Sequence, residues 1–119
     1  MIKEFAFVVY PVSDVGRAVS FYRDTIGLTP GEPVSDSWVE FDIGDTTFGV
    51  VGNAESIGIS PGTQFSAAFE VDDIAAMRKS LVAKSVTVSD VMDFPHCFTA
   101  FVTDPDGNRF ALHQRKPRV

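Results

Sequence analysis

The sequence repeats itself, and this repeat limits the folds that the chain can adopt. Val12–Val15 matches Val71–Ile74 at an offset of 59 residues, and Phe48–Val50 matches Phe110–Leu112 at an offset of 62 residues. Both matches keep the same order of elements, a strand, a helix and then three strands. Neither half can bury its own sheet face, so we predict one domain that forms when two modules pair.

The spacing of apolar residues predicts the elements of each module. In the first half, the helix is expected to begin after Asp14 and to end at Gly27, and a loop with Pro30, Gly31 and Pro33 follows it. The elements expected in this half are a strand at 5–12, a helix at 15–26 and a hairpin of strands 38–43 and 46–51. Those expected in the second half are a strand at 65–71, a helix capped by Asp72 and Asp73, a short strand at 86–88, and a hairpin of strands 98–103 and 109–114. The predicted class is α+β, with a single domain over 1–119 that comprises module one (1–52), a linker (53–62) and module two (63–119).

Composition excludes several classes of function. The formal net charge is −6, whereas binding to nucleic acid phosphates needs a basic face. Cys97 is the only cysteine, which excludes an intrachain disulfide and a cysteine-rich zinc site. No apolar stretch is long enough to span a membrane, and the first residues carry no signal-peptide pattern. We therefore expect a cytoplasmic protein with neither nucleic acid nor membrane as a partner.

Three blocks of sequence resemble a known superfamily. Tyr10–Asp14 followed by Phe21–Gly27 resembles the opening motif of the vicinal oxygen chelate superfamily, which has the glyoxalase/bleomycin-resistance fold. Phe69–Asp73 resembles its mid-chain "F-x-V-D-D", and Asp104–Phe110 resembles its closing "D-P-D-G-N". The blocks cover nearly the whole chain in the family's order. They indicate the fold and leave the reaction open, because the superfamily includes isomerases, dioxygenases, thiol transferases and drug-sequestering proteins.

The resemblance implies two tandem βαβββ modules that form an incompletely closed, eight-stranded cup with helices outside. Strand alternation then divides the side chains between the two sheet faces. The side chains expected to pack on helices are Ala6, Val8, Phe48, Val50, Phe65, Ala67, Phe110 and Leu112. Those expected to face the cup are Phe5, Phe7, Val9, Thr47, Gly49, Val51, Gln64, Ser66, Ala68, Arg109, Ala111 and His113.

The family's metal site is expected to be missing. Catalytic members hold a divalent metal with four side chains, usually His and Glu, and the resemblance places these positions at Phe7, Gly49, Ser66 and Ala111. Only the serine offers a donor atom, and a lone hydroxyl is a poor ligand. We therefore predict no metal and no cofactor.

The remaining candidates each have a structural alternative. Trp38 offers a ring for stacking a ligand, or packs in the core or a dimer interface. Glu40 pairs with a ligand cation, or is a solvated strand carboxylate. Phe5 and Phe7 form an apolar floor, or fill the cup themselves.

The two histidines are also candidates. His113 shares the strand face of Ala111 and acts as a general base or ligand contact, or is a strand-end residue near solvent. His96 and Cys97 precede the last hairpin and are expected at the rim of the cup. Adjacent residues on an extended chain point in opposite directions, so a Cys–His nucleophile pair is not expected.

The predicted function is binding of a small molecule. The predicted ligand-binding residues are Phe5, Phe7, Trp38, Glu40, Gly49, Ser66, His96, Ala111 and His113, while catalytic residues stay unassigned. The leading hypothesis is a homodimeric, metal-free protein that sequesters an aromatic or cationic compound such as an antibiotic, as in the bleomycin-resistance branch. The alternative is an enzyme of lyase, isomerase or dioxygenase type that uses His113, Glu40 or His96 as acid or base. A third hypothesis is a structural module whose cup is filled by its own Phe side chains.

Overall fold

A computed structural model describes residues 1–33 and 35–117 of the chain. The chain forms two compact units. Unit 1 comprises Met1–Gln64 and Pro105–Asn108, and unit 2 comprises Phe65–Asp104 and Arg109–Val119. In the described residues, no helix has the length and apolar character needed to cross a membrane.

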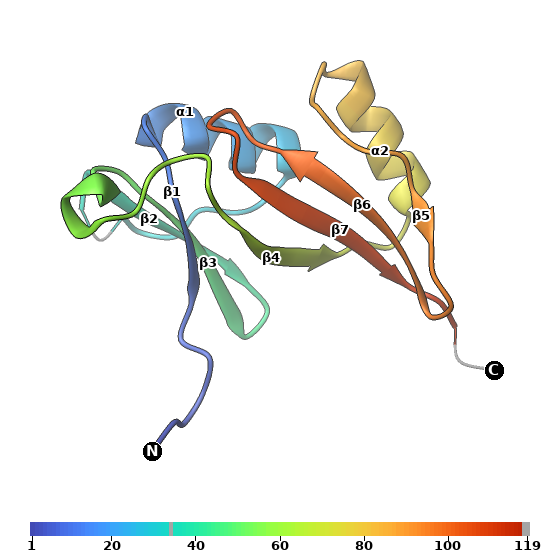
Figure 1. Cartoon of the computed structure of the whole chain (residues 1–119), viewed down its shortest axis with the longest axis horizontal. Helices are drawn as coiled ribbons and strands as arrows, with labels where there is room; N and C mark the ends of the chain where they lie inside the picture. Colours follow the sequence, from blue (N-terminus) through green and yellow to red (C-terminus); the bar gives the residue numbers. More distant parts are fainter. Residues whose placement is uncertain (34, 118–119) are drawn as a thin grey trace. The chain divides into compact units, whose positions relative to one another are not determined.

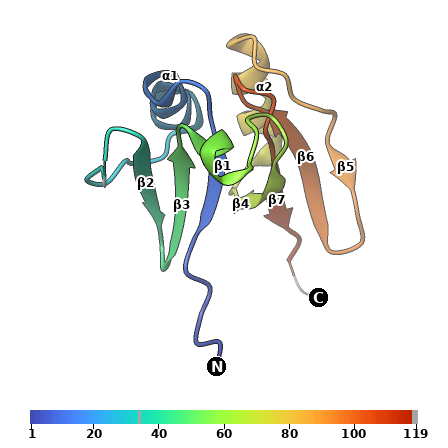
Figure 2. The ribbon, with the colours of Figure 1, turned by 60° about the vertical axis from the view of Figure 1, so that its left-hand side comes forward.

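Unit 1 contains a three-stranded sheet with the order β1-β3-β2 (Figure 2). Strand β1 pairs with β3 in parallel, and β2 pairs with β3 antiparallel as the predicted hairpin. Its elements are β1 (Val8–Pro11), α1 (Val15–Ser20), the π-helix η1 (Phe21–Ile26), β2 (Trp38–Ile43), β3 (Thr46–Val51) and the short 3-10 helix η2 (Ala54–Ile57).

The first helix begins and ends where the sequence predicts. The Asp14 carboxylate accepts a hydrogen bond from the Arg17 backbone N–H at 3.0 Å, and Gly27 ends the helix with φ of 95°. The second half of the helix is a π-helix, which the apolar spacing did not predict. Within it Tyr22 is fully buried, with its ring 5.0 Å from that of Phe48.

The core of unit 1 is a cluster of rings between this helix and the sheet. Tyr10, Phe41 and Phe48 lie on the helix-facing side of their strands, and Tyr10 and Phe41 are fully buried. Burial of one such ring stabilises the fold by about 2 kcal/mol. The predicted helix-facing positions Phe48 and Val50 are confirmed.

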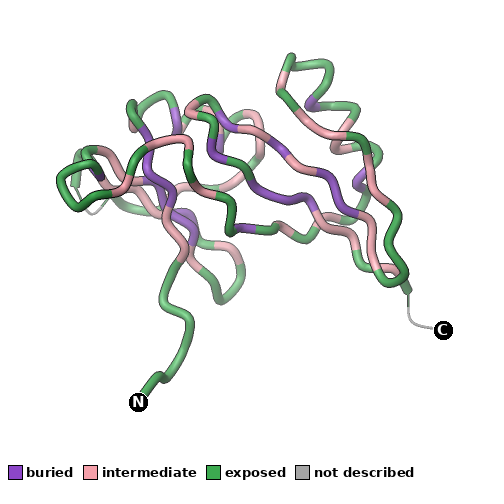
Figure 3. Tube along the Cα trace, viewed as in Figure 1, coloured by how far each residue is buried: buried purple, intermediate pink, exposed green. Residues whose placement is uncertain are grey.

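Two predictions for unit 1 are wrong. The first strand begins at Val8 and not at Phe5, which in the β1–β3 register would lie opposite Asp45, in the turn before β3. Residues 1–7 are exposed and form no strand (Figure 3). The described residues of the segment 28–36 form a loop, as predicted. They make only the isolated bridges Pro30↔Phe41 and Ser35↔Trp38, because prolines lack the N–H that a ladder needs, and so do not supply the eighth strand that the resemblance implies; Val34 lies outside the described residues. The described residues therefore contain seven strands in two sheets, and not eight strands.

Unit 2 contains a four-stranded sheet with the order β4-β7-β6-β5 (Figure 1). Helix α2 packs on β6 and β7, with Leu81, Phe110 and Leu112 fully buried between them. The predicted last hairpin and the helix-facing side of Phe110 and Leu112 are therefore confirmed. The elements of this unit are β4 (Phe65–Glu70), α2 (Ile74–Ala83), β5 (Met92–Asp93), β6 (Cys97–Thr103) and β7 (Arg109–Arg115).

Three predictions for unit 2 need correction. The N-cap of α2 is Asp73 alone, whose carboxylate accepts from the Ala76 backbone N–H at 3.0 Å. The segment 86–88 makes only one bridge, Val88↔Val102, and the short strand lies at Met92–Asp93. Phe65 is 52% exposed, because an extra residue between Phe65 and Ala68 shifts the β4–β7 register and turns Phe65 to the other face.

The module boundaries that the sequence predicts differ from those of the two units. The predicted linker 53–62 and the turn 105–108 both belong to unit 1. The prediction that the modules form a single domain with one cup stays a prediction.

Two side chains of the turn 105–108 bind it to other segments of unit 1. Asn108 is fully buried; its Nδ2 donates to the Pro11 carbonyl at 2.7 Å, and its Oδ1 accepts from the backbone N–H groups of Gly62 at 3.0 Å and Gln64 at 3.2 Å. Asp106 Oδ1 accepts from the Ser13 backbone N–H at 2.9 Å and from the Arg17 guanidinium at 3.0 Å.

We predict that Asn108→Ala lowers the free energy of unfolding by about 3 kcal/mol, because it removes the three hydrogen bonds that this buried side chain makes with backbone groups. Urea denaturation measures this change. Gln64→Ala is the matched control, since it removes an amide side chain nearby and keeps the backbone N–H that Asn108 accepts; its effect should stay below about 0.5 kcal/mol. Equal effects of the two substitutions would contradict the prediction.

Candidate ligand-binding site

In unit 1, four of the predicted site residues lie close together. Trp38 and Glu40 occupy the face of β2 away from the core, and Trp38 Nε1 donates to Glu40 Oε2 at 2.9 Å. The Phe7 ring contacts Trp38 edge-on, with 5.3 Å between ring centroids, and is 45% exposed. Gly49 lies opposite Glu40, and a Cβ there would be 3.3 Å from the Val39 carbonyl oxygen. Phe5 is 82% exposed and lies outside the sheet.

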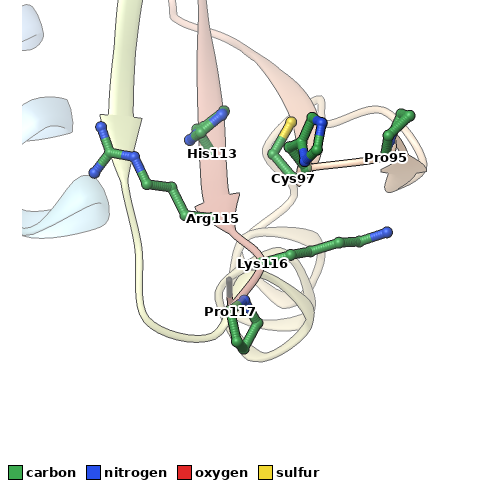
Figure 4. Close-up of a pocket in the computed structure, with 7 residues that line it drawn as sticks. Pro95, Cys97, His113, Arg115, Lys116 and Pro117 are labelled. Carbon is green, nitrogen blue, oxygen red and sulfur yellow. The ribbon is translucent and has the colours of Figure 1, made fainter. Parts of the chain in front are cut away.

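Unit 2 contains a cavity of about 770 Å³ at the ends of β6 and β7 (Figure 4). It brings together both predicted histidines, which are the only two in the chain. Its lining residues are Pro95, His96, Cys97, His113, Arg115, Lys116 and Pro117. Of the other predicted residues of this unit, Ala111 precedes His113 by two positions on β7, and Ser66 lies on β4, where it is exposed.

The most important residue that sequence reasoning missed is Glu70. It lies opposite His113 in the β4–β7 ladder, and its Oε1 is 2.6 Å from His113 Nδ1. Its Oε2 accepts a hydrogen bond from the Arg115 backbone N–H at 2.7 Å. These bonds hold the pKa of Glu70 below its ordinary value, and the bond with His113 contributes more than the bond with Arg115.

The ionised Glu70 fixes the orientation of the imidazole. Because a carboxylate only accepts hydrogen bonds, Nδ1 of His113 carries the proton and donates it, which leaves Nε2 for a ligand. The signal in the sequence was strand alternation, which places Glu70 on the same face as Ala68. The sequence did not show that Glu70 lies opposite His113 on β7, because the extra residue in β4 changes the register of the ladder.

A second missed feature is an aromatic cluster on the same face of the unit 2 sheet. Arg109 Cζ lies 5.2 Å from the ring centroid of Phe65 and 5.1 Å from that of Phe101. The two rings contact each other edge-on at 5.1 Å. The guanidinium therefore lies within the range of cation–π interaction with both rings.

Cys97 and His96 make no nucleophile pair. Cys97 Sγ lies 3.6 Å from Thr99 Oγ1, and Cys97 pairs with Arg115 in the β6–β7 ladder. The His96 carbonyl accepts from the Lys116 backbone N–H at 3.0 Å. Both side chains line the cavity of unit 2, so the prediction that they lie beside a ligand site remains open.

The four family metal positions do not fit a divalent metal. In unit 1, Phe7 and Gly49 offer no donor atom, and in unit 2, Ala111 offers none and Ser66 offers one hydroxyl. Across residues 1–33 and 35–117, no group of three or more His, Cys, Asp or Glu side chains is placed to hold a metal ion.

The fold is that of one superfamily. The sequence profile of the Glyoxalase/Bleomycin resistance protein/Dioxygenase superfamily matches residues 4–112, and the chain belongs to this superfamily. The resemblance found in the three sequence blocks is thereby confirmed.

Individual relatives differ in function. An antibiotic binding protein, TnmS3 from Streptomyces sp. CB03234, has a crystal structure that matches with a TM-score of 0.83 and 27% identity, over 97% of this chain and 98% of that chain. A glyoxalase/bleomycin resistance protein of the same strain matches with a TM-score of 0.80 and 28% identity, over 93% of this chain and 100% of that chain. The lactoylglutathione lyase GLX1 of Arabidopsis thaliana is 30% identical over 129 aligned residues, which cover 97% of this chain and 45% of that protein. The chain thus spans less than half the length of this curated relative.

We predict that the bond between Glu70 and His113 makes stability depend on pH. Because the pKa of folded Glu70 lies below its ordinary value of 4.5, its stabilising effect is present above that value and is lost as pH falls through the lower, folded pKa. Between about pH 5 and about pH 3, the free energy of unfolding, measured by denaturation, should decrease more in the unaltered protein than in Glu70→Gln. Glu55→Gln, which removes an exposed carboxylate from η2, is the control and should keep the original dependence. Identical pH dependence of all three proteins would contradict the prediction.

Proposed function

We propose that this protein binds and sequesters an aromatic small molecule without a metal ion. One observation carries the proposal: the exposed Phe7 ring lies edge-on to Trp38, and the sequence resemblance assigns the first metal ligand of the family to this same residue. Binding at that position therefore rests on ring contacts and hydrogen bonds, which suit an aromatic ligand. Similarity to the antibiotic binding protein supports the same proposal.

Of the aromatic and cationic ligands predicted from the sequence, the geometry favours the aromatic one. Glu40 accepts the indole N–H of Trp38 and so holds the ring in position for contact with an aromatic ligand. We further propose that the protein is a cytoplasmic homodimer. Size-exclusion chromatography with light scattering tests the oligomeric state, and cell fractionation tests the location.

Because Trp38 is the only tryptophan, its fluorescence reports on ligands near the unit 1 face. We predict that planar aromatic antibiotics, tested with an anthracycline and a phenazine, quench this fluorescence and are recovered unchanged by mass spectrometry. Elemental analysis should find no stoichiometric transition metal, and added Zn²⁺ or Ni²⁺ should leave affinity unchanged. A bound transition ion would overturn the proposal, and so would the failure of every compound in the panel to bind.

Trp38→Ala should weaken binding of the same ligands by about 1 kcal/mol, which is the contribution of one aromatic contact. Isothermal titration calorimetry measures this loss without the tryptophan signal. Val82→Ala is the control, because Val82 is an apolar side chain that is 51% exposed on α2 of unit 2. Weakening by both substitutions alike would show that the ring has no specific role.

A second candidate function is a metal-independent enzyme in which His113 is the acid–base group. The bond from His113 Nδ1 to Glu70 supports it, since a carboxylate that orients an imidazole is a recurring feature of general-base sites. We propose no catalytic role for Glu40, whose carboxylate accepts from Trp38.

For this second candidate we predict that His113→Ala slows turnover of a carbonyl or epoxide substrate by about a hundredfold or more. His96→Gln is the matched control, since it changes the other imidazole of the cavity and keeps the bond between Glu70 and His113. Steady-state kinetics over a range of pH make the comparison. Turnover that survives His113→Ala would exclude this mechanism.

A further inference from the structure

The face of the unit 2 sheet away from α2 carries an aromatic cluster at one end. The rings of Phe65 and Phe101 contact each other there, and Arg109 Cζ lies 5.2 Å and 5.1 Å from their centroids. Phe65 is 52% exposed, and Arg109 is exposed beside it. Aromatic rings and a guanidinium group both pack against planar molecules, so this end of the face suits the ring of a ligand.

Small side chains lead from this cluster to His113. Arg109, Ala111 and His113 follow each other at every second position of β7, so their side chains lie on the same face. Because a strand rises about 3.3 Å per residue, the Cα atoms of Arg109 and His113 are about 13 Å apart. Ala111, between them, lies opposite Ala68 in the β4–β7 ladder. The two methyl groups form a low, apolar floor between the guanidinium and the imidazole.

At the other end of this floor, His113 offers a hydrogen-bond acceptor. Its Nδ1 donates to Glu70 Oε1 at 2.6 Å, so the lone pair of the neutral imidazole is on Nε2. The two nitrogens lie on different sides of the ring, so Nε2 points away from Glu70. The side chain is 32% exposed, and in residues 1–33 and 35–117 no group hydrogen-bonds to Nε2. Nε2 can therefore accept a hydrogen bond from a ligand.

The charges around the imidazole favour a neutral ligand. The ionised Glu70 carboxylate, 2.6 Å from the imidazole, repels an anion that approaches His113. Arg109 and Arg115 repel a cation, since both lie on the same face of β7 as His113, one on each side of it. An uncharged O–H group avoids both effects and supplies the proton that Nε2 accepts. A phenol joins such a group to an aromatic ring.

We propose that this face of unit 2 binds a neutral phenol, with its ring beside Phe65 and Phe101 and its hydroxyl group donating to His113 Nε2. Glu70 is a positioning residue, because it keeps the proton of the imidazole on Nδ1. This inference rests on the proposed function, since it takes the ligand to be aromatic. It adds the chemical class of the ligand and the residues of unit 2 that recognise it.

The test uses the full-length protein and two matched probes, 2-naphthol and 2-methoxynaphthalene. The two compounds share the ring system and the oxygen atom, and only 2-naphthol has a proton to donate. Isothermal titration calorimetry is carried out at about pH 8, where an ordinary histidine side chain is neutral. The affinity for 2-naphthol should be at least about fivefold higher, which is the contribution of one hydrogen bond. Equal affinities would overturn the inference.

Two variants separate the hydrogen bond from the ring contact. His113→Phe keeps a ring and removes the acceptor, so it should abolish the preference for 2-naphthol and leave the affinity for 2-methoxynaphthalene unchanged. Phe65→Ala should lower both affinities about fivefold and keep their ratio. Lys79→Phe is the matched control, because it adds the same ring at an exposed position of α2, on the opposite side of the sheet, and it should change neither affinity. A preference that survives His113→Phe would contradict the inference, and so would unaltered affinities in Phe65→Ala.

NMR of the ¹⁵N-labelled protein tests the contact without a substitution at His113, and the chain contains only two histidines. The Nε2 signal of His113 should be that of a nitrogen without a proton, and it should shift further with 2-naphthol than with 2-methoxynaphthalene. In Glu70→Gln the two ring nitrogens should share the proton, because an amide both donates and accepts, and the preference for 2-naphthol should fall. An Nε2 signal that saturating 2-naphthol leaves unchanged would overturn the inference.

These results distinguish the inference from the proposed function. If aromatic antibiotics quench Trp38 while 2-naphthol and 2-methoxynaphthalene bind alike, only the inference fails. If neither the antibiotics nor the two probes bind, both fail. If the antibiotics do not bind but 2-naphthol binds through His113, the proposed sequestering function fails and the phenol site stands.

Discussion

One-sided burial is the constraint on which both units depend. Each unit has a short sheet with a single helical segment against one face, so only one set of alternating side chains becomes core. In unit 1 this set includes Phe41 and Phe48 beneath Tyr22, and in unit 2 it includes Phe110 and Leu112 beneath α2. The opposite set does not enter that core and can vary in chemistry with little cost to folding.

This division explains how the chain keeps the superfamily's fold without a full set of donor side chains at the positions that the resemblance assigns to the metal ligands. The ligand positions Phe7, Gly49, Ser66 and Ala111 do not belong to the helix-facing set, so replacing their donor atoms leaves the helix-facing core intact. The residues that hold the turns are different. Asn108 and Asp106 of the "D-P-D-G-N" block bind backbone groups near Pro11, Ser13 and Gly62, which gives this block a structural role in unit 1.

Sequence reasoning predicted the elements whose alternation is unbroken, and it failed where register changes. Phe48, Val50, Phe110 and Leu112 lie as predicted, because β3 and β7 have regular ladders. Phe65 lies on the opposite face, because an extra residue in β4 reverses the alternation, and a single sequence shows no sign of it. The contact between Glu70 and His113 depends on the same register, so Glu70 was not predicted as a site residue, although its partner His113 was.

The bond from the Arg115 backbone N–H to Glu70 has a consequence for the end of β7. The same carboxylate holds a side chain of the cavity and a main-chain amide of the strand. A molecule that draws His113 away from Glu70, or that competes for the carboxylate, changes the protection of this amide as well. The rate of hydrogen–deuterium exchange at the Arg115 amide would therefore detect such a molecule from the main chain, with no label on the ligand.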